Sequence, residues 1–128
     1  EYAFAQKIPY ATIQNQRGEL VEPTAETISA AASGVIPTDT RTSITNADAA
    51  GAYPIATFTW MIIYKEQNYS DRSKEQATAT LNLLQYILSD EAQKITSEVH
   101  YAPLPAQAKE LSLKNLKTVT YDGVTILQ

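Results

Sequence analysis

The chain has no cysteine, one histidine, four scattered glycines and no long apolar run. The absence of cysteine excludes disulfide bonds and thiolate metal sites. Because His100 is the single histidine, a metal site here would have to rely on carboxylates around it. The glycines stand apart from one another, so the chain has no glycine-rich loop of the kind that holds a phosphate group on bare backbone N–H groups.

Positive charge is also scarce, since the net charge is -4 and the ten Lys and Arg residues are scattered. Binding to nucleic acid usually needs a basic face, so we expect no nucleic-acid partner. The most apolar run, Ile55 to Tyr64, is about half of the roughly 18 residues that cross a bilayer, so we expect no membrane insertion. The opening Glu1-Tyr2-Ala3-Phe4 has neither an initiator Met nor a basic leader region, and we interpret it as a cut within a longer chain.

What is present is typical of one globular domain. The 128 residues are 44% hydrophobic and 19% charged, and a chain of this size buries about two-thirds of its unfolded surface. The patterns and capping residues predict, in order, an end of a helix at 2–6, strands at 10–14 and 20–21, a helix from Pro23-Thr24 to Gly34, a loop at 37–51, helices starting at Ser73 and Ser89, a third helix at 106–116 and a hairpin at 118–127. Strands and helices therefore mix, which indicates an α/β arrangement.

The segment Ile55 to Tyr64 is the strongest predicted strand. It is apolar on both faces, as in a central strand that helices cover on both sides. We therefore expect it to be the most buried element of the fold, with Trp60 packed in the core, so that Trp60→Ala would unfold the chain. The fold prediction depends on this strand.

The side chains that could carry chemistry all have a simpler structural explanation. His100 follows a predicted helix and has no partner of a catalytic triad, and Asp71, Asp90 and Glu91 stand at or before helix starts, where the helix dipole stabilises negative charge. No nucleophile elbow surrounds a serine, so four hydroxyls remain without a catalytic context, those of Ser29, Ser33, Thr57 and Thr59. We expect no catalytic residue, no metal and no cofactor.

Two binding alternatives stay open at this point. The helix starts at Thr24, Ser73 and Ser89 are of the type that can hold an anion, although most helix starts hold none. Tyr53, Trp60 and Tyr64 are candidates for a stacking platform, although core packing is the better explanation on so apolar a strand.

Three segments, in order along the chain, resemble the phosphate-binding proteins of ABC phosphate importers. They are Glu1-Tyr2-Ala3-Phe4-Ala5, Ala52-Tyr53-Pro54-Ile55 with Thr59-Trp60 behind it, and Tyr101-Ala102-Pro103-Leu104-Pro105. Glu22-Pro23-Thr24 and Thr45-Asn46 also fall where that family has similar residues. The resemblance covers nearly the whole chain and places it in the C-terminal portion of such a protein.

This resemblance implies a partial, two-lobed type II periplasmic-binding-protein fold of the α/β class. Residues 1–128 would form its C-terminal portion, with about 1–50 ending the second lobe and about 51–128 returning to the first. In the family, phosphate lies between the lobes and is held by hydroxyls, backbone N–H groups, an Arg and an Asp. The matched pattern puts those ligands upstream of Glu1, and the chain has no Ser-Gly-Thr segment, so the phosphate ligands are unknown here.

The resemblance also implies a role in transport. The parent protein would capture inorganic phosphate in the periplasm or at the cell surface and deliver it to an ABC permease, without being an enzyme. The alternative is a fragment or split half that acts as a structural or interaction module and does not bind phosphate by itself. Such a module would need the N-terminal portion of the same protein or a swapped copy, because a sheet without its neighbours exposes unpaired edges.

Overall fold

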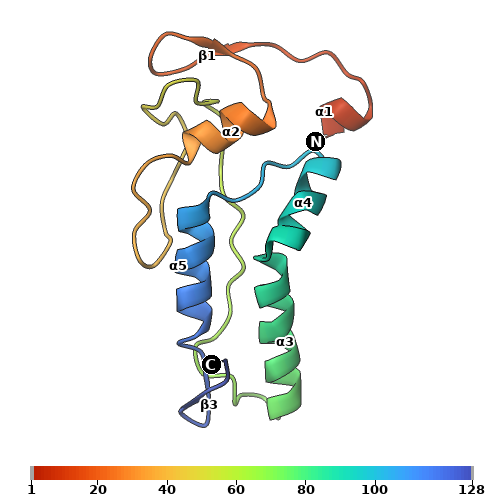
Figure 1. The fold of residues 1–128 in the computed structure, drawn as a ribbon, viewed down its shortest axis with the longest axis vertical. Coiled ribbons are helices and arrows are strands. Elements are labelled where there is room, and N and C mark those ends of the chain that lie inside the picture. Colours follow the sequence, from red (N-terminus) through yellow and green to blue (C-terminus); the bar gives the residue numbers. More distant parts are fainter. Residues whose placement is uncertain (1, 128) are drawn as a thin grey trace.

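The computed structural model describes residues 2–127, and within them helices and short strands alternate in an elongated arrangement (Figure 1). The elements are α1 (Tyr2–Ala5), β1 (Ile13–Gln14), β2 (Leu20–Val21), α2 (Ala25–Ala31), α3 (Lys74–Ile87), α4 (Asp90–Glu98), α5 (Ala106–Leu116), β3 (Thr120–Tyr121) and β4 (Val124–Thr125). The mixture of helix and strand predicted from the sequence is confirmed. None of the helices described is long and apolar enough to cross a bilayer.

The first hairpin and α2 form one end of the molecule (Figure 1). β1 and β2 pair antiparallel, with Ile13 opposite Val21, and Gly18 supplies the positive φ of +80° that the turn needs. The first strand is shorter than predicted, because only Ile13–Gln14 pairs. Thr24 caps α2 as predicted, and the helix ends at Ala31, three residues before Gly34.

α3 and α4 follow one another and α5 runs beside them, in agreement with the predicted helices (Figure 1). Ser73 and Gln76 form the predicted capping box at the start of α3. Four apolar residues at helical spacing form the buried side of α3 and of its C-cap: Ala77, Leu81, Leu84 and Leu88.

The apolar residues of α4 do not form a buried side. Ile95 and Val99 are exposed, whereas the polar Gln93 is buried. Gln93 donates a hydrogen bond to the Ile87 carbonyl at 2.9 Å and accepts one from the Leu104 N–H at 2.7 Å. These two bonds satisfy the amide, so α4 is fixed to its flanking segments by polar contacts rather than by an apolar stripe.

The second hairpin closes the described part of the chain as predicted. β3 and β4 pair antiparallel, with Thr120 opposite Thr125 and Tyr121 opposite Val124. The turn residues Asp122 and Gly123 both have positive φ, at +52° and +74°. Two positive φ values are the requirement of the tight turn that an Asp-Gly pair favours.

The predicted central strand at 55–64 is wrong for this chain. The segment belongs to neither of the two-stranded sheets, and it runs as an extended connection that lies between α5 and α3 in the view of Figure 1. Ile62 is 94% exposed and Trp60 is 44% exposed, so the segment is not the most buried element and Trp60 is not a core residue. The physical reason is that the backbone of a strand is hydrogen-bonded only by neighbouring strands, and neither two-stranded sheet of the described residues supplies a neighbour for this segment. The structure therefore confirms a mixture of helix and strand, but this segment gives no support to the predicted central strand of an α/β sheet.

Two small apolar cores lie at the two ends of that segment. The first core consists of Ala31, Ala32, Ile44, Ala52 and Ala56, with Phe58 packed against it. The second core consists of Leu81, Leu84 and Val119, with Ile63 packed against it. The first core is mostly alanine, which lets the backbone of residues 52–56 approach α2 closely, as the Tyr53 N–H bond to the Thr27 carbonyl at 2.9 Å shows.

Candidate functional site

The three helix starts that were candidates for anion binding are occupied by their own side chains. The Thr24 hydroxyl accepts from the Thr27 N–H, Ser73 from the Gln76 N–H and Ser89 from the Ala92 N–H. In α2 and α3 the third residue also returns a bond to the cap, which completes two capping boxes. Each start also lies beside acidic side chains, Glu26, Glu75, Asp90 and Glu91, which disfavour a second anion.

His100 lies directly after α4, at a position with a left-handed backbone (φ +62°). The Tyr101 N–H bonds to the Thr96 carbonyl at 2.8 Å, so the two residues close the end of the helix. The imidazole stacks on Phe4, with ring centroids 5.5 Å apart and planes 22° apart. The shallow hollow around it is lined by Tyr2, Ala5, Glu98 and Val99, and among the described residues no hydrogen bond joins the imidazole to the Glu98 carboxylate or to the Tyr2 hydroxyl, so no catalytic pair is assembled there.

The candidate carboxylates are separated by the fold. Asp90 forms an ion pair with Lys109 of α5, and this contact lowers the pKa of Asp90, with a smaller contribution from Lys94. Glu91 is exposed in the first turn of α4, and Asp71 lies in an exposed turn with φ +58°. Within residues 2–127 no three His, Cys, Asp or Glu side chains are grouped so that they could hold a metal ion.

The four candidate hydroxyls do not come together either. Ser29 belongs to α2 and Ser33 follows it, whereas Thr57 and Thr59 belong to the extended segment. The Thr57 hydroxyl donates to the neighbouring Phe58 carbonyl at 3.2 Å. No histidine or carboxylate bonds to any of these hydroxyls in the part of the chain described, so the arrangement gives no activated nucleophile.

The candidate aromatic platform is divided between two different pairs. Trp60 meets Phe58 edge to face, with centroids 6.0 Å apart, and its indole N–H donates to the Thr40 carbonyl at 3.1 Å. Tyr64 meets Tyr69 edge to face at 4.9 Å. Tyr53 is held at the start of the segment through its backbone bond to Thr27. The exposed rings are therefore spread along a strip rather than stacked as a binding surface.

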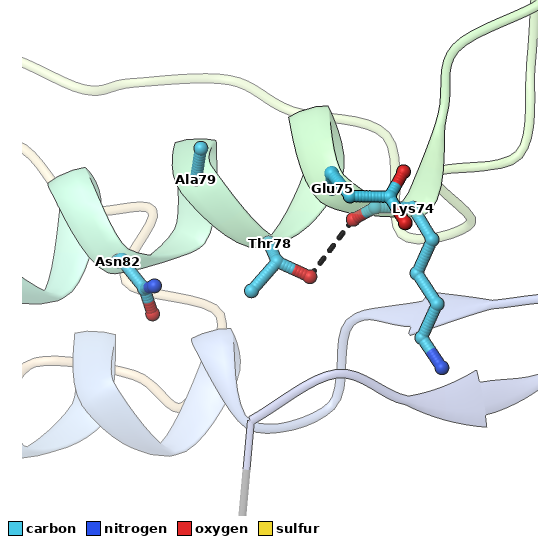
Figure 2. A pocket seen from close by; sticks show the side chains of 5 residues that line it. All are labelled: Lys74, Glu75, Thr78, Ala79 and Asn82. Atoms are coloured by element: carbon cyan, nitrogen blue, oxygen red, sulfur yellow. Dashed lines mark hydrogen bonds between the residues drawn. The ribbon is translucent and has the colours of Figure 1, made fainter.

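A depression on α3, drawn in Figure 2, is formed by one helix alone. It is lined by Lys74, Glu75, Thr78, Ala79 and Asn82, and the Thr78 hydroxyl donates to the Lys74 carbonyl at 2.8 Å. The Lys74 side chain extends away from Thr78 and Asn82 in this view. The Glu75 carboxylate accepts from its own N–H and from the Ser73 hydroxyl, and these bonds lower its pKa. The lining therefore carries one positive and one negative charge, Lys74 and Glu75, and has no excess of positive charge that would attract phosphate.

Sequence reasoning missed Arg72, which binds inside the protein. Its guanidinium donates to the Tyr69 hydroxyl at 3.1 Å, to the Gln76 carbonyl at 3.2 Å and to the Thr80 hydroxyl, and it lies over the Tyr69 ring. The Tyr121 hydroxyl donates to the Arg72 carbonyl at 2.9 Å. Arg72 thus joins α3 to the second hairpin, and a guanidinium engaged in this way is not placed to grip a phosphate group.

A polar junction at residues 51–52 was also missed. The buried Asn15 donates to the Ala52 carbonyl at 3.2 Å and to the Glu19 carboxylate at 2.7 Å, and Glu19 also accepts from the Gly51 N–H at 2.7 Å. The Asn15 amide is the main cause that lowers the pKa of Glu19. The side-chain carbonyl oxygen of Asn15 accepts hydrogen bonds from the N–H groups of Arg17 and Glu19. Asn commonly forms a turn of this kind, so the turn could have been predicted from the sequence. The contact between Asn15 and the distant Ala52 could not have been predicted in this way.

Glu66 forms a second polar junction, where the extended segment meets the second hairpin. Its carboxylate accepts from the N–H groups of Asn68, Asp122 and Gly123 and from the Thr120 hydroxyl, at 2.8–3.1 Å. These four donors lower the pKa of Glu66 to about 2, with the Asn68 N–H the largest cause. Hydrogen bonds from the same chain occupy the carboxylate oxygens, so the role of Glu66 in this structure is to hold the extended segment against the second hairpin.

Comparison with known proteins gives the family that these residues alone do not. The chain is 31% identical over 127 residues to the phosphate-binding protein PstS of Methanocaldococcus jannaschii, an alignment that covers 92% of the chain and 33% of the relative. It is 35% and 34% identical over 107 residues to the phosphate-binding proteins PstS of two Xylella fastidiosa strains, Temecula1 and 9a5c, with 81% of the chain and 28% of each relative covered. No family model matches the chain.

These similarities confirm the predicted resemblance. The chain is a relative of the PstS phosphate-binding proteins, and it spans about a third of the length of the curated relatives it matches. A match of this extent is what a portion of such a protein would give, and it agrees with the observation that the described residues contain no assembled phosphate site.

Proposed function

We propose that this chain is part of an extracytoplasmic solute-binding protein that captures inorganic phosphate for an ABC importer. The single observation that carries the proposal is its similarity, over 81–92% of its length, to proteins named as phosphate-binding. The role is binding rather than catalysis, in the periplasm or at the cell surface, with a membrane permease as the docking partner. The fold to which it contributes is the two-lobed type II periplasmic-binding-protein fold.

The chain would contribute parts of both lobes. The division proposed from the sequence puts about 1–50 at the end of the second lobe and about 51–128 in the return to the first. Two separate cores are in keeping with two partial lobes, and they favour a later boundary, since Ala52, Ala56 and Phe58 pack with the first core and Ile63 with the second. The extended segment would then be the connection between the lobes as well as a strand of the first lobe.

A second candidate is a module that does not bind phosphate without the rest of the protein. The observations that favour it are the self-capped helix starts and the internally bonded Arg72, so that within residues 2–127 none of these four groups is positioned for phosphate. In this case the phosphate ligands come from the N-terminal portion of the same protein, which also completes the sheet.

Calorimetric titration with phosphate separates the two candidates. The 128-residue chain alone is expected to give no heat of binding, and the same chain mixed with the complementary N-terminal portion is expected to bind phosphate. Sulfate at equal concentration serves as the control for a nonspecific anion effect. Tight phosphate binding by the chain alone would eliminate the module, and a mixture that assembles without binding phosphate would overturn the transport role.

A further inference from the structure

Asp122-Gly123 is the one place in the sequence where an Asp or Asn residue precedes a glycine. Such a pair can react with itself: the Gly123 nitrogen bonds to the side-chain carboxyl carbon of Asp122, and the carboxyl OH leaves with the N–H hydrogen as water. Water then opens the resulting five-membered imide. Opening at the backbone carbonyl leaves an isoaspartyl residue, in which the main chain runs through the former side chain. No co-reactant other than water is needed, and glycine favours the ring because it has no side chain to obstruct closure.

The conformation of the turn decides whether the two reacting groups can meet. Asp122 and Gly123 are exposed and have φ values of +52° and +74°, the pattern of a type I′ turn. In such a turn ψ of the first residue is about +30°, which places the next nitrogen on the opposite side of the Cα–C bond from Cβ, away from the side-chain carboxyl. Ring closure needs a ψ of about −120°, the value of a type II′ turn, so the Asp122–Gly123 peptide must first rotate by roughly 150°.

Glu66 holds this peptide in the unreactive orientation. Its carboxylate accepts the Gly123 N–H at 3.1 Å and the Asp122 N–H at 3.0 Å, so rotation of the peptide would break the first of these bonds. Loss of the Gly123 proton during the attack would also bring negative charge beside the carboxylate, which is unfavourable. The Asn68 N–H at 2.9 Å and the Thr120 hydroxyl at 2.8 Å fix Glu66 in turn, so it is not free to follow a rotating peptide. The side-chain amide of Asn68 donates to the Asp122 carboxylate, which fixes the second reacting group.

We propose that Asp122-Gly123 is a site of spontaneous isomerisation to isoaspartate, and that Glu66 is the positioning residue that suppresses this reaction in the folded protein. An isoaspartyl residue adds one carbon to the main chain of a turn whose length sets the register of β3 and β4. Directly behind the turn, Ile126 bonds to the Val119 carbonyl at 3.1 Å and packs against the second core. Isomerisation therefore releases the second hairpin from the second core.

Glu66→Ala and Glu110→Ala test the protection, because each removes the carboxylate of an exposed residue. The chains are incubated in heavy-oxygen water at about pH 5, where part of an ordinary aspartate is protonated and Glu66, with a pKa of about 2, is still ionised. Chromatography with mass spectrometry then measures the labelled isoaspartyl peptide at position 122. The native chain and Glu110→Ala are expected to react slowly, and Glu66→Ala roughly tenfold faster, the factor that corresponds to the loss of one hydrogen bond to a charged group.

Thr120→Val separates this protection from a general loosening of the hairpin. It removes another hydrogen bond of Glu66 but leaves both turn N–H groups on the carboxylate, so its rate of isomerisation should stay near that of the native chain even where its melting midpoint falls. Equal acceleration in Thr120→Val and Glu66→Ala, or none in Glu66→Ala, would overturn the role of Glu66.

The native chain unfolded in urea tests the site itself. It is expected to form isoaspartate at position 122 at least as fast as folded Glu66→Ala, because nothing then holds the peptide. An unfolded chain that forms none would overturn the site, and a folded native chain that reacts as fast as the unfolded one would overturn the protection. Phosphate takes no part in these measurements, so their outcome leaves the proposed transport role untouched.

Discussion

Helix α3 and the segment 55–64 are both rich in apolar residues, yet the chain buries one and exposes the other. Leu81 of α3 is fully buried, whereas Ile62 of the segment is 94% exposed. A helix satisfies its own backbone and needs only one covered face, which α5, the second hairpin and Ile63 provide. A strand needs partners on its edges, and the described residues supply one bridge beyond its end. Apolar sequence therefore guarantees burial only where the chain also supplies the neighbours.

The largest effect is expected from the buried side of α3. Leu81→Ala should lower the free energy of unfolding by roughly 2–5 kcal/mol, because it leaves a cavity in the second core. Leu83→Ala is the matched control on the exposed side of the same helix and should change stability little. Urea denaturation followed by circular dichroism gives both values. Equal losses for the two variants would mean that α3 does not pack as described.

Trp60→Ala sharpens the comparison from the side of the segment. Burial of Trp60 was predicted from the sequence, with unfolding as the result of its removal, but a half-exposed ring gives a smaller expectation. The variant loses the edge-to-face contact with Phe58 and the hydrogen bond to Thr40, which together contribute about 1–2 kcal/mol. Thermal melting should show a folded protein with a reduced midpoint, and complete unfolding would restore the original expectation of a core tryptophan.

Ser73→Ala tests whether α3 depends on local signals. Removal of the capping hydroxyl should cost about 1 kcal/mol, since the Gln76 N–H loses its acceptor. Ser97→Ala, near the exposed end of α4, removes the same hydroxyl without removing a cap and should be nearly neutral. Denaturation midpoints of the two variants measure the difference. If both variants behave alike, tertiary packing alone must hold the helix start.

The last effect is expected at Glu66, where a difference in stability that is present at neutral pH should disappear in acid. Its pKa of about 2 lies below the ordinary 4.5, so its contribution to stability is present above about pH 4.5 and is lost as the pH falls toward 2. Glu66→Gln should therefore flatten the acid side of the stability curve. Glu19, Glu26, Asp39, Glu75 and Asp90 also have lowered pKa values, so part of the acid sensitivity should remain.

Melting midpoints from pH 7 to pH 2 provide the measurement. Glu110→Gln, at an exposed position of α5, is the control for the loss of one negative charge. The expectation fails if Glu66→Gln and Glu110→Gln show the same pH profile.

The sequence alone determined the elements whose hydrogen bonds are local. The helix caps at Thr24 and Ser73, the bounds of α5 and the Asp-Gly hairpin follow from side chains and turns within a few residues of one another, and all three were predicted. The ordered motifs also identified the relatives, because sequence similarity survives in a portion of a protein even where no site is assembled.

Only the tertiary structure decided which apolar residues are buried and which polar ones are. In the folded chain Gln93 is buried and Ile62 is exposed, and Asn15 bonds to Ala52. The charged groups of Glu66 and Arg72 bond to Thr120 and Thr80 of the same chain. For Asn15 and Glu66 the partners are distant in sequence, 37 residues away for Ala52 and 57 residues away for Gly123. A periodic pattern indicates which face of a segment favours an apolar environment, whereas burial requires neighbouring strands or helices that cover that face. For the segment 55–64 the described residues do not supply these neighbours.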